Sequence, residues 1–184
     1  ALPILINNQK LSLALTQAQT WDLDWCLRLN RYSANRHIGL FFKGVSRLGD
    51  GWFWYALGGG VALAGGAASA GFVLQAGLTS AAGVVLYKLL KKHTLRPRPY
   101  QVHQAVVLGE RPLDHFSFPS GHTLHAVLFT VMFGSQFPVL LPLLIPFMAL
   151  VAASRVILGL HYPTDVLAGA TLGGVLAAAS LLAF

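Results

Sequence analysis

Three polar segments interrupt an otherwise apolar chain, and each contains residue types that can act on a phosphate group. The first segment (91–99) is rich in Lys and Arg, the second (118–122) joins Ser, Gly and His, and the third (154–165) combines Arg, His and Asp. Basic side chains bind phosphate oxygens through charge-assisted hydrogen bonds. An imidazole can attack phosphorus or move a proton, and a carboxylate can orient it. The three segments therefore indicate chemistry on a phosphoryl group.

The spacing within these segments makes the pattern specific. The first reads Lys, six residues, Arg-Pro; the second reads Pro-Ser-Gly-His; the third reads Ser-Arg, five residues, His, three residues, Asp. Over about residues 88–170 the chain thereby resembles the type 2 phosphatidic acid phosphatase family, which shares its site with bacterial acid phosphatases and vanadium haloperoxidases. All eleven signature positions match in order: Lys91, Arg98, Pro99, Pro119, Ser120, Gly121, His122, Ser154, Arg155, His161 and Asp165.

The resemblance implies a role for each polar residue of the signature. His161 is the expected nucleophile, which would form a phosphohistidine. Asp165, four residues on, is expected on the same helical face, where it would orient the imidazole. His122 is the expected general acid for the leaving oxygen and then the base for attacking water. The expected phosphate ligands are three cations and two residues before the next helix, whose N-terminal N–H groups would face an anion: Lys91, Arg98, Ser120, Gly121 and Arg155.

Other titratable residues lie outside the signature. Asp114 could orient a basic residue, and no role is assigned to it. His125, three residues after His122, is near the expected pocket, and its role stays open. Lys92, Arg96 and Arg111 either attract anionic headgroups or follow the general charge bias of membrane proteins. The remaining histidines are interpreted as solvated loop residues: His37, His93, His103 and His115.

No metal or cofactor is expected. The chain has only six carboxylates, and no histidine–carboxylate set beyond His161 and Asp165 suggests a metal site. The single cysteine, Cys26, can form neither an intramolecular disulfide nor a cysteine-based metal site.

The composition is that of a membrane protein. Of 184 residues, 55% are hydrophobic and only 10% are charged, with a mean hydropathy of +0.61. Soluble domains carry about 25% charged residues, and disordered chains have far fewer apolar ones. The net charge of +7 is confined to a few segments, whereas nucleic-acid binders spread charge over a soluble surface. A bilayer and an anionic lipid are therefore the expected partners, and nucleic acid is not.

Long neutral stretches predict the membrane crossings. Residues 51–87 carry no charged side chain. A single helix of that length would be about 55 Å long, against a hydrocarbon core of about 30 Å, so we expect two crossings with a turn near Ala70-Gly71. Glycines at 58–60 and 65–66 are expected to form a small-residue face for close helix packing.

The rest of the chain completes an all-α, polytopic transmembrane helix bundle. Crossings are predicted at about 123–137 and 139–157, and a fifth at 166–184. Many membrane members of the resembled family have six crossings, so we expect that either a first helix is absent here or residues 1–20, which are weakly apolar, are its remnant. The whole chain is predicted to be one integral-membrane phosphatase domain, with a catalytic core at 51–184.

Residues 1–50 are expected to form an interfacial N-terminal segment. Over 21–50, aromatic residues such as Trp21 and Trp25 alternate with charged ones such as Asp22 and Arg28. This pattern predicts an amphipathic helix lying along the membrane surface.

Antiparallel crossings would gather the three polar segments, and every Lys and Arg beyond Lys10, on one membrane face. The positive-inside rule places that face in the cytoplasm, whereas many bacterial relatives of the resembled family work on the outer face of the cytoplasmic membrane. The expected location is the bacterial inner membrane, with the active face open between these two and no prediction of oligomeric state.

The expected function is that of an integral membrane lipid phosphatase acting through a phosphohistidine. The resemblance allows phosphatidate, phosphatidylglycerophosphate, undecaprenyl diphosphate and lipid A phosphates as substrates, and nothing in the sequence selects among them. Two alternatives stay open: a lipid phosphotransferase with the same site, and a non-catalytic lipid-phosphate carrier that would keep the cations without needing His161 and Asp165.

Overall fold

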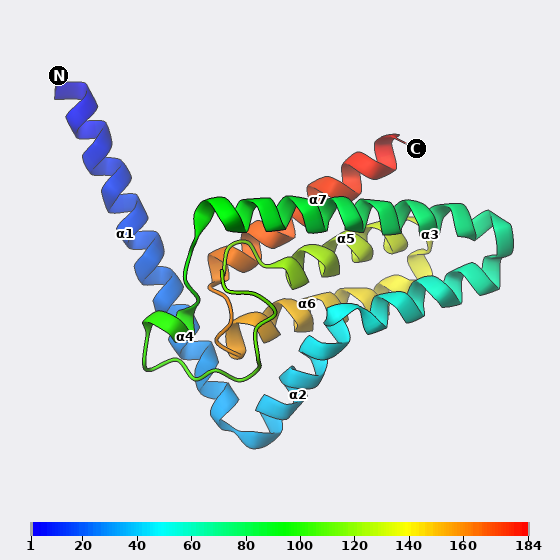
Figure 1. Cartoon of the computed structure of the whole chain (residues 1–184), viewed down its shortest axis with the longest axis horizontal. Helices are drawn as coiled ribbons and strands as arrows, with labels where there is room; N and C mark the ends of the chain where they lie inside the picture. Colours follow the sequence, from blue (N-terminus) through cyan, green and yellow to red (C-terminus); the bar gives the residue numbers. More distant parts are fainter. Residues whose placement is uncertain (1, 184) are drawn as a thin grey trace.

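The regular structure is helical throughout the part of the chain that the structure describes. This computed structural model describes the backbone of residues 2–183 and the side chains of residue 13 and residues 15–183. Figure 1 shows the long helices side by side along one axis, with α1 diverging from them. The helices are α1 (Leu2–Asn30), α2 (Arg36–Arg47), α3 (Phe53–Thr94), α4 (Pro99–Val102), α5 (Gly121–Gln136), α6 (Leu141–Ile157) and α7 (Pro163–Ala183). The all-α bundle predicted from the sequence is confirmed.

Helix α3 folds back on itself at Gly66, so that it forms two antiparallel arms (Figure 1). Gly66 has φ 58° and ψ −145°, a conformation that glycine adopts readily because it has no Cβ. The predicted turn near Ala70-Gly71 is therefore wrong by a few residues. The packing face predicted for 65–66 is also wrong, because these glycines make the turn; of the others, Gly58 alone packs against neighbours.

The remaining apolar helices lie close to their predicted positions. The break between α5 and α6 falls at Phe137 and the short helical turn Pro138–Leu140. Among the described residues, three stretches are long and apolar enough to cross a membrane: Arg36–Val102, which includes both arms of α3, Pro138–Ile157 and Pro163–Ala183. Helix α5 has 16 residues, about 24 Å at 1.5 Å per residue, and the total of five crossings remains a prediction.

The N-terminal region differs from the single surface helix expected over 21–50. Helix α1 runs without interruption through this region to Asn30, and a short turn at Arg31–Ala34 separates it from α2. Asn35 starts α2, because its side-chain oxygen accepts hydrogen bonds from the N–H groups of His37 and Ile38. The chain thus changes direction at a cap, which hydrophobic patterning does not register.

Helix α5 lies at the centre of the bundle and packs against α3, α6 and α7. Its buried side chains Leu124, Leu128 and Met132 belong to a core shared with these helices. Small residues bring α7 unusually close: a Cβ added at Gly169 would lie 2.4 Å from the Ser120 carbonyl oxygen, and one at Gly173 would lie 2.2 Å from that of Leu124. This contact holds the start of α5 against the start of α7.

Replacing Gly173 with alanine is expected to destabilise the fold by about 1–3 kcal/mol, the usual cost of overpacking. The added methyl would meet backbone, which cannot rotate away, so α5 and α7 would have to separate. The measurement is the thermal unfolding midpoint in detergent. Gly174→Ala is the matched control on the same helix, because its nearest neighbour is Val127 Cγ1 at 3.9 Å. Equal loss of stability in both variants would contradict this account of the packing.

Candidate active site

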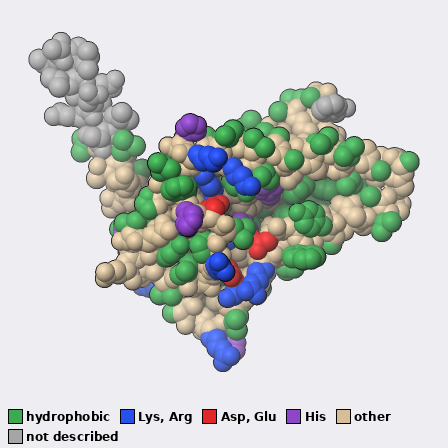
Figure 2. All heavy atoms as spheres, in the orientation of Figure 1, with side chains coloured by type: hydrophobic (Ala, Val, Ile, Leu, Met, Phe, Trp, Pro, Cys, Tyr) green, Lys and Arg blue, Asp and Glu red, His purple; other side chains and the backbone are tan. Residues whose placement is uncertain are grey.

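The three polar segments meet at one end of the bundle. Figure 2 shows charged and histidine side chains gathered over this end, while the opposite end of the bundle shows hydrophobic and neutral side chains. Here a cavity of about 200 Å³ opens between α3, α5, α6 and the loops. Six of the eight residues predicted for the site line it: Lys91, Arg98, Gly121, His122, Arg155 and His161. Ser120 and Asp165 lie outside its lining.

Two of the cations share one carboxylate. Lys91 Nζ donates to both oxygens of Asp114, at 2.7 and 2.8 Å, and Arg98 donates to Asp114 Oδ1 at 2.7 Å. Both basic side chains are buried. The pKa of Asp114 is lowered, because hydrogen bonds and charges from Lys91 and Arg98 outweigh the effect of its burial. The carboxylate therefore stays ionised and fixes two cations at the cavity wall.

Arg155 is held differently from the other two cations. It lies at the end of α6, is 2% exposed, and donates from one terminal nitrogen to Ser46 Oγ at 2.5 Å. Its Nε is buried without a hydrogen-bond partner. Among the residues that the structure describes, no carboxylate forms an ion pair with it. A buried guanidinium with this surplus of charge and donors is suited to an anion.

His161 presents one ring nitrogen to the cations. Its Nε2 lies 3.2 Å from a terminal nitrogen of Arg98, and because a guanidinium only donates, Nε2 must be the unprotonated acceptor. Burial, and then the charges of Arg98 and the other cations, lower the pKa of His161 well below its usual value. The imidazole is therefore neutral, with a lone pair on Nε2, as a nucleophile requires.

Asp165 stands behind His161, but not on a shared helical face. His161 precedes α7 and Asp165 lies in the first turn of that helix, so the predicted helical register between them is wrong. The two side chains approach to 3.6 Å, between His161 Nδ1 and Asp165 Oδ2, and Nδ1 has no hydrogen-bond partner within usual limits. The proton assigned to Nδ1 faces the carboxylate at a distance that a small ring movement would close.

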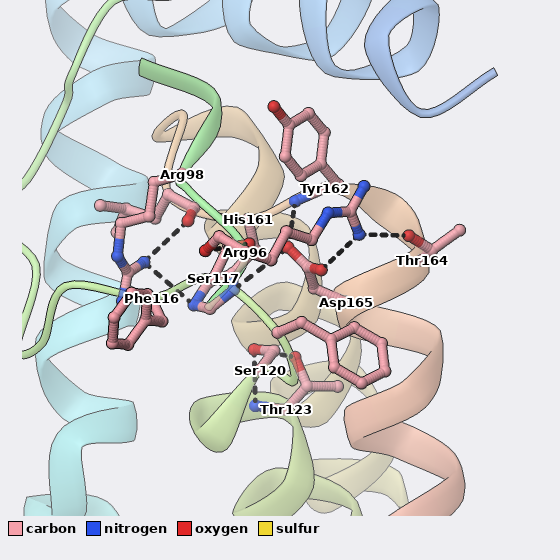
Figure 3. A network of polar contacts seen from close by, with 12 residues as sticks. Arg96, Arg98, Phe116, Ser117, Ser120, Thr123, His161, Tyr162, Thr164 and Asp165 are labelled. Atoms are coloured by element: carbon pink, nitrogen blue, oxygen red, sulfur yellow. Dashed lines mark hydrogen bonds and ion pairs between the residues drawn. The ribbon is translucent and has the colours of Figure 1, made fainter. Parts of the chain in front are cut away.

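A buried network fixes Asp165 (Figure 3). Arg96 donates to Asp165 Oδ1 at 2.6 Å and to Asp22 Oδ2 at 2.6 Å. Asp22, on α1, also accepts a hydrogen bond from the N–H of Thr164 at 2.9 Å. Tyr162 N–H donates to the second oxygen of Asp165 at 2.8 Å. The N-terminal helix is thus connected to His161 and Asp165 through Arg96. Arg96 was expected to attract headgroups or to reflect charge bias, and the structure corrects that expectation.

The start of α5 supplies backbone and one histidine to the cavity. Ser120 is the N-cap of α5, and its buried Oγ accepts from Thr123 N–H at 3.4 Å and contacts Thr123 Oγ1 at 3.0 Å (Figure 3). The structure therefore places Ser120 in a capping role, behind the wall where a phosphate ligand was predicted. His122 lines the cavity, and its Nε2 contacts Asp50 Oδ1.

The cavity continues into an apolar cleft. Between the two arms of α3 and helix α5 its lining changes from charged to mainly aromatic and aliphatic side chains: Trp54, Tyr55, Val84, Tyr87 and Phe129. His125 also lines this part and contacts the carbonyl oxygens of Gly121 and Ser80. The site thus combines a cationic end with an apolar extension.

Sequence reasoning missed two of the acids that hold this site together. Asp50 and Asp22 each pair with a histidine or basic residue far away in the chain. For Asp114 the sequence allowed an orienting role toward a basic residue, and the structure pairs it with Lys91 and Arg98. The sequence did contain one signal for these pairs. With six acidic residues against 13 basic ones, few carboxylates are expected to face solvent without a basic partner. Among the described residues, no group of three or more His, Cys, Asp or Glu side chains could hold a metal ion.

Comparison with known protein families identifies the family to which this chain belongs. The sequence profile of the PAP2 superfamily matches residues 72–184, which include all three segments. The chain belongs to the PAP2 superfamily. It is a phosphatase, and its apolar helices make it a multi-pass membrane protein.

Individual PAP2 relatives agree with this assignment. The decaprenylphosphoryl-5-phosphoribose phosphatase of Mycobacterium tuberculosis is 33% identical over 140 residues, covering 74% of this chain and 75% of that relative. The lipid A 1-phosphatase of Rhizobium etli is 34% identical over 94 residues, covering 49% of this chain and 40% of the relative.

Two solved PAP2 structures have the same fold. LpxE of Aquifex aeolicus superposes with a TM-score of 0.76 at 25% identity, covering 88% of this chain and 94% of that one. A transmembrane PAP2-type phosphatidylglycerolphosphate phosphatase from Bacillus subtilis superposes with a TM-score of 0.70 at 24% identity, covering 97% and 94%.

Proposed function

We propose that the protein hydrolyses a phosphate group from a membrane lipid in the bacterial cytoplasmic membrane, through a phosphohistidine at His161. The observation that carries the proposal is the cavity itself, where Lys91, Arg98, Arg155 and His161 Nε2 converge beside an apolar cleft. The cationic end suits a phosphoryl group and the cleft suits a lipid chain.

The three cations bind the phosphoryl oxygens and stabilise charge as it develops in the transition state. Arg155 supports this assignment most directly, because its buried charge has no close described counter-ion. Arg98 serves twice: it reaches the phosphoryl group and holds His161 in place at 3.2 Å. Gly121, the first residue of α5, lines the cavity, and the free N–H groups of a helix N-terminus favour an anion there.

In the first half-reaction, His161 Nε2 forms a bond to phosphorus and the bond from phosphorus to the lipid oxygen breaks. His122 gives a proton to that oxygen, which leaves as an alcohol or, from a diphosphate, as a phosphate. Asp165 stabilises the positive charge that the ring of His161 acquires, through the proton on Nδ1. In the second half-reaction, water attacks phosphorus, His122 takes its proton, and the bond to His161 breaks.

The apolar cleft favours a lipid as the leaving group. Trp54, Val84 and Phe129 line the cavity and offer an apolar surface to a lipid chain. The arms of α3 that bound it consist of residues without charge between 51 and 87, so a chain entering between them would leave the bilayer only at its phosphate end. Soluble phosphate esters, which lack an apolar chain, would gain no binding energy from this surface.

Water is favoured over a second lipid as the acceptor. Asp50, His122 and Arg155 line both the cavity and a separate polar hollow on its outer side, which is also lined by Ser46, Arg47, Glu110 and Arg111. Water therefore has a polar route to the residue that would activate it. A phosphotransferase would need an apolar approach on this side.

Phosphate release from a panel of purified lipids tests this function. The panel contains phosphatidate, phosphatidylglycerophosphate, undecaprenyl diphosphate, a lipid A 1-phosphate and decaprenylphosphoryl-5-phosphoribose, since relatives act on the last two types. We expect turnover of at least one lipid, undiminished by EDTA, and at least about 100-fold lower kcat/KM for a soluble sugar phosphate that lacks the apolar chain. Activity confined to soluble esters, or abolished by the chelator, would contradict the proposal.

A further inference from the structure

A second carboxylate–histidine pair lies in the site, in addition to His161 and Asp165. Asp50 Oδ1 contacts His122 Nε2, although the two residues are 72 positions apart in the chain. Asp50 precedes the segment matched by the family profile, which begins at residue 72, and it belongs to none of the three polar segments. We propose that Asp50 is a positioning residue that holds the His122 imidazole in the orientation and tautomer needed to move protons during catalysis. This inference rests on the proposed role of His122.

The contact defines which ring nitrogen exchanges the proton. An ionised carboxylate only accepts hydrogen bonds, so Nε2 of His122 carries a hydrogen that points to Asp50. Nδ1 is then the nitrogen that gains and loses a proton. The first half-reaction starts from the imidazolium, protonated on both nitrogens, which gives its Nδ1 proton to the leaving oxygen; the second starts from the neutral ring, whose Nδ1 takes a proton from water. The hydrogen bond to Asp50 keeps the Nε2 hydrogen in place throughout, whereas a freely rotating ring would turn Nδ1 away from the substrate.

The backbone around Asp50 is shaped to present this side chain. Asp50 lies in a π-helical turn, Leu48–Trp52, between α2 and α3. Gly51 has φ 141°, a conformation that other residues rarely adopt, and a Cβ there would lie 2.8 Å from the Tyr55 ring. On the other side, a Cβ at Gly49 would lie 3.1 Å from Val151 and 3.8 Å from the His122 ring. Gly49 therefore lets the turn approach α6 and His122 closely, and Gly51 permits the backbone conformation that follows Asp50.

The surroundings of this pair differ from those of the nucleophile pair. The Asp50 side chain is 34% exposed and that of His122 is 10% exposed, whereas His161 and Asp165 are 2% and 0% exposed. Asp50 and His122 line both the cavity and the outer polar hollow. The buried pair thus suits covalent catalysis, and the open pair suits proton exchange with water. Because the two carboxylate–histidine pairs have different environments, one histidine can act as the nucleophile and the other as the acid and base.

A purely structural role is the alternative, because the same contact ties the start of α3 to α5. The two roles differ in how they depend on the leaving group. Proton donation matters most when the departing oxygen is a strongly basic alkoxide, and little when it is a stabilised aryloxide. A structural defect would slow both kinds of substrate alike.

The test is Asp50→Asn, assayed on a lipid phosphate and on p-nitrophenyl phosphate. We expect kcat on the lipid to fall about 10- to 100-fold, with KM changed less than about twofold, and kcat on the aryl ester to fall less than about threefold. Asp50→Glu should recover part of the lipid activity. Glu110→Gln is the matched control, because Glu110 lines the outer hollow but pairs with Lys43 and Arg47. Thermal midpoints in detergent verify that each variant is folded.

A double-mutant cycle with His122→Asn completes the test. If Asp50 acts through His122, Asp50→Asn should cost less than about twofold in the His122→Asn background. Equal losses on both substrates, or additive losses in the cycle, would overturn the assignment of Asp50. Full lipid activity of His122→Asn would instead refute the proposed role of His122, so the two failures are distinguishable.

Discussion

Replacing His161 with asparagine should lower the rate of phosphate release at least about 10⁴-fold and abolish the phosphoenzyme, because the Nε2 lone pair held beside Arg98 is the proposed nucleophile and an amide cannot replace it. Asparagine retains an oxygen that can accept from Arg98, so the cationic wall should stay in place. A labelled, non-hydrolysable phosphonate analogue should therefore bind to the variant with affinity close to that of the original protein.

The direct measurement is a rapid quench with a ³²P-labelled lipid phosphate. The unmodified protein should acquire a label that is stable in alkali and lost in acid, as expected for a phosphorus–nitrogen bond, and the variant should acquire none. His115→Asn is the control, because His115 is an exposed histidine next to Asp114 that does not line the cavity. Turnover or labelling of the His161 variant at an undiminished level would exclude His161 as the nucleophile.

Replacing Arg155 with methionine should lower kcat/KM about 10³-fold or more, the scale on which a single transition-state arginine contributes to phosphoryl transfer. The same substitution should leave stability unchanged or increase it. The reason is that Arg155 is a buried cation whose described contacts include a hydroxyl but no close carboxylate, so methionine removes a buried charge that forms no ion pair. A fall in kcat/KM together with unchanged or increased stability would show that Arg155 serves ligand binding rather than folding.

Arg155→Lys refines this prediction. Lysine keeps the charge but loses the planar pair of donors, so we expect partial recovery of kcat/KM relative to methionine. Arg47→Met is the control, since the Arg47 side chain is 63% exposed and pairs with Glu110 at 3.3 Å; its effect on activity should stay within about threefold. Loss of stability in Arg155→Met comparable to a core defect would show that the guanidinium supports the fold rather than the substrate.

The apolar helices and the grouping of the three segments could be predicted because both follow from the order of residues along the chain. Runs without charge must leave water, and antiparallel crossings return polar segments to one face. Lys91, Arg98, Arg155 and His161 accordingly line a single cavity. Hydropathy is a sum over many residues, however, and it is insensitive to single backbone angles. It therefore missed the turn at Gly66 and the cap at Asn35, each of which depends on one residue.

The partners of individual polar side chains could not be predicted in the same way. For Ser120 the sequence allowed a helix cap or a phosphate ligand; in the folded protein its side chain caps α5, and its role as a phosphate ligand stays a prediction. Asp114 had several basic residues within reach of its segment, and the folded loop gives it Lys91 and Arg98 together. Arg96 is directed at Asp22 and Asp165 because α1 packs beside the start of α7.

By itself, the sequence determined that this chain enters a membrane and carries the residues of a phosphatase at family spacing, because both properties are written in residue type and order. The tertiary structure alone decided which carboxylate serves which cation or imidazole, as in the pairing of Asp50 with His122 across 72 residues. An ion pair depends on distance in space, and only the packing of α2, α3, α5 and α6 brings those two side chains together.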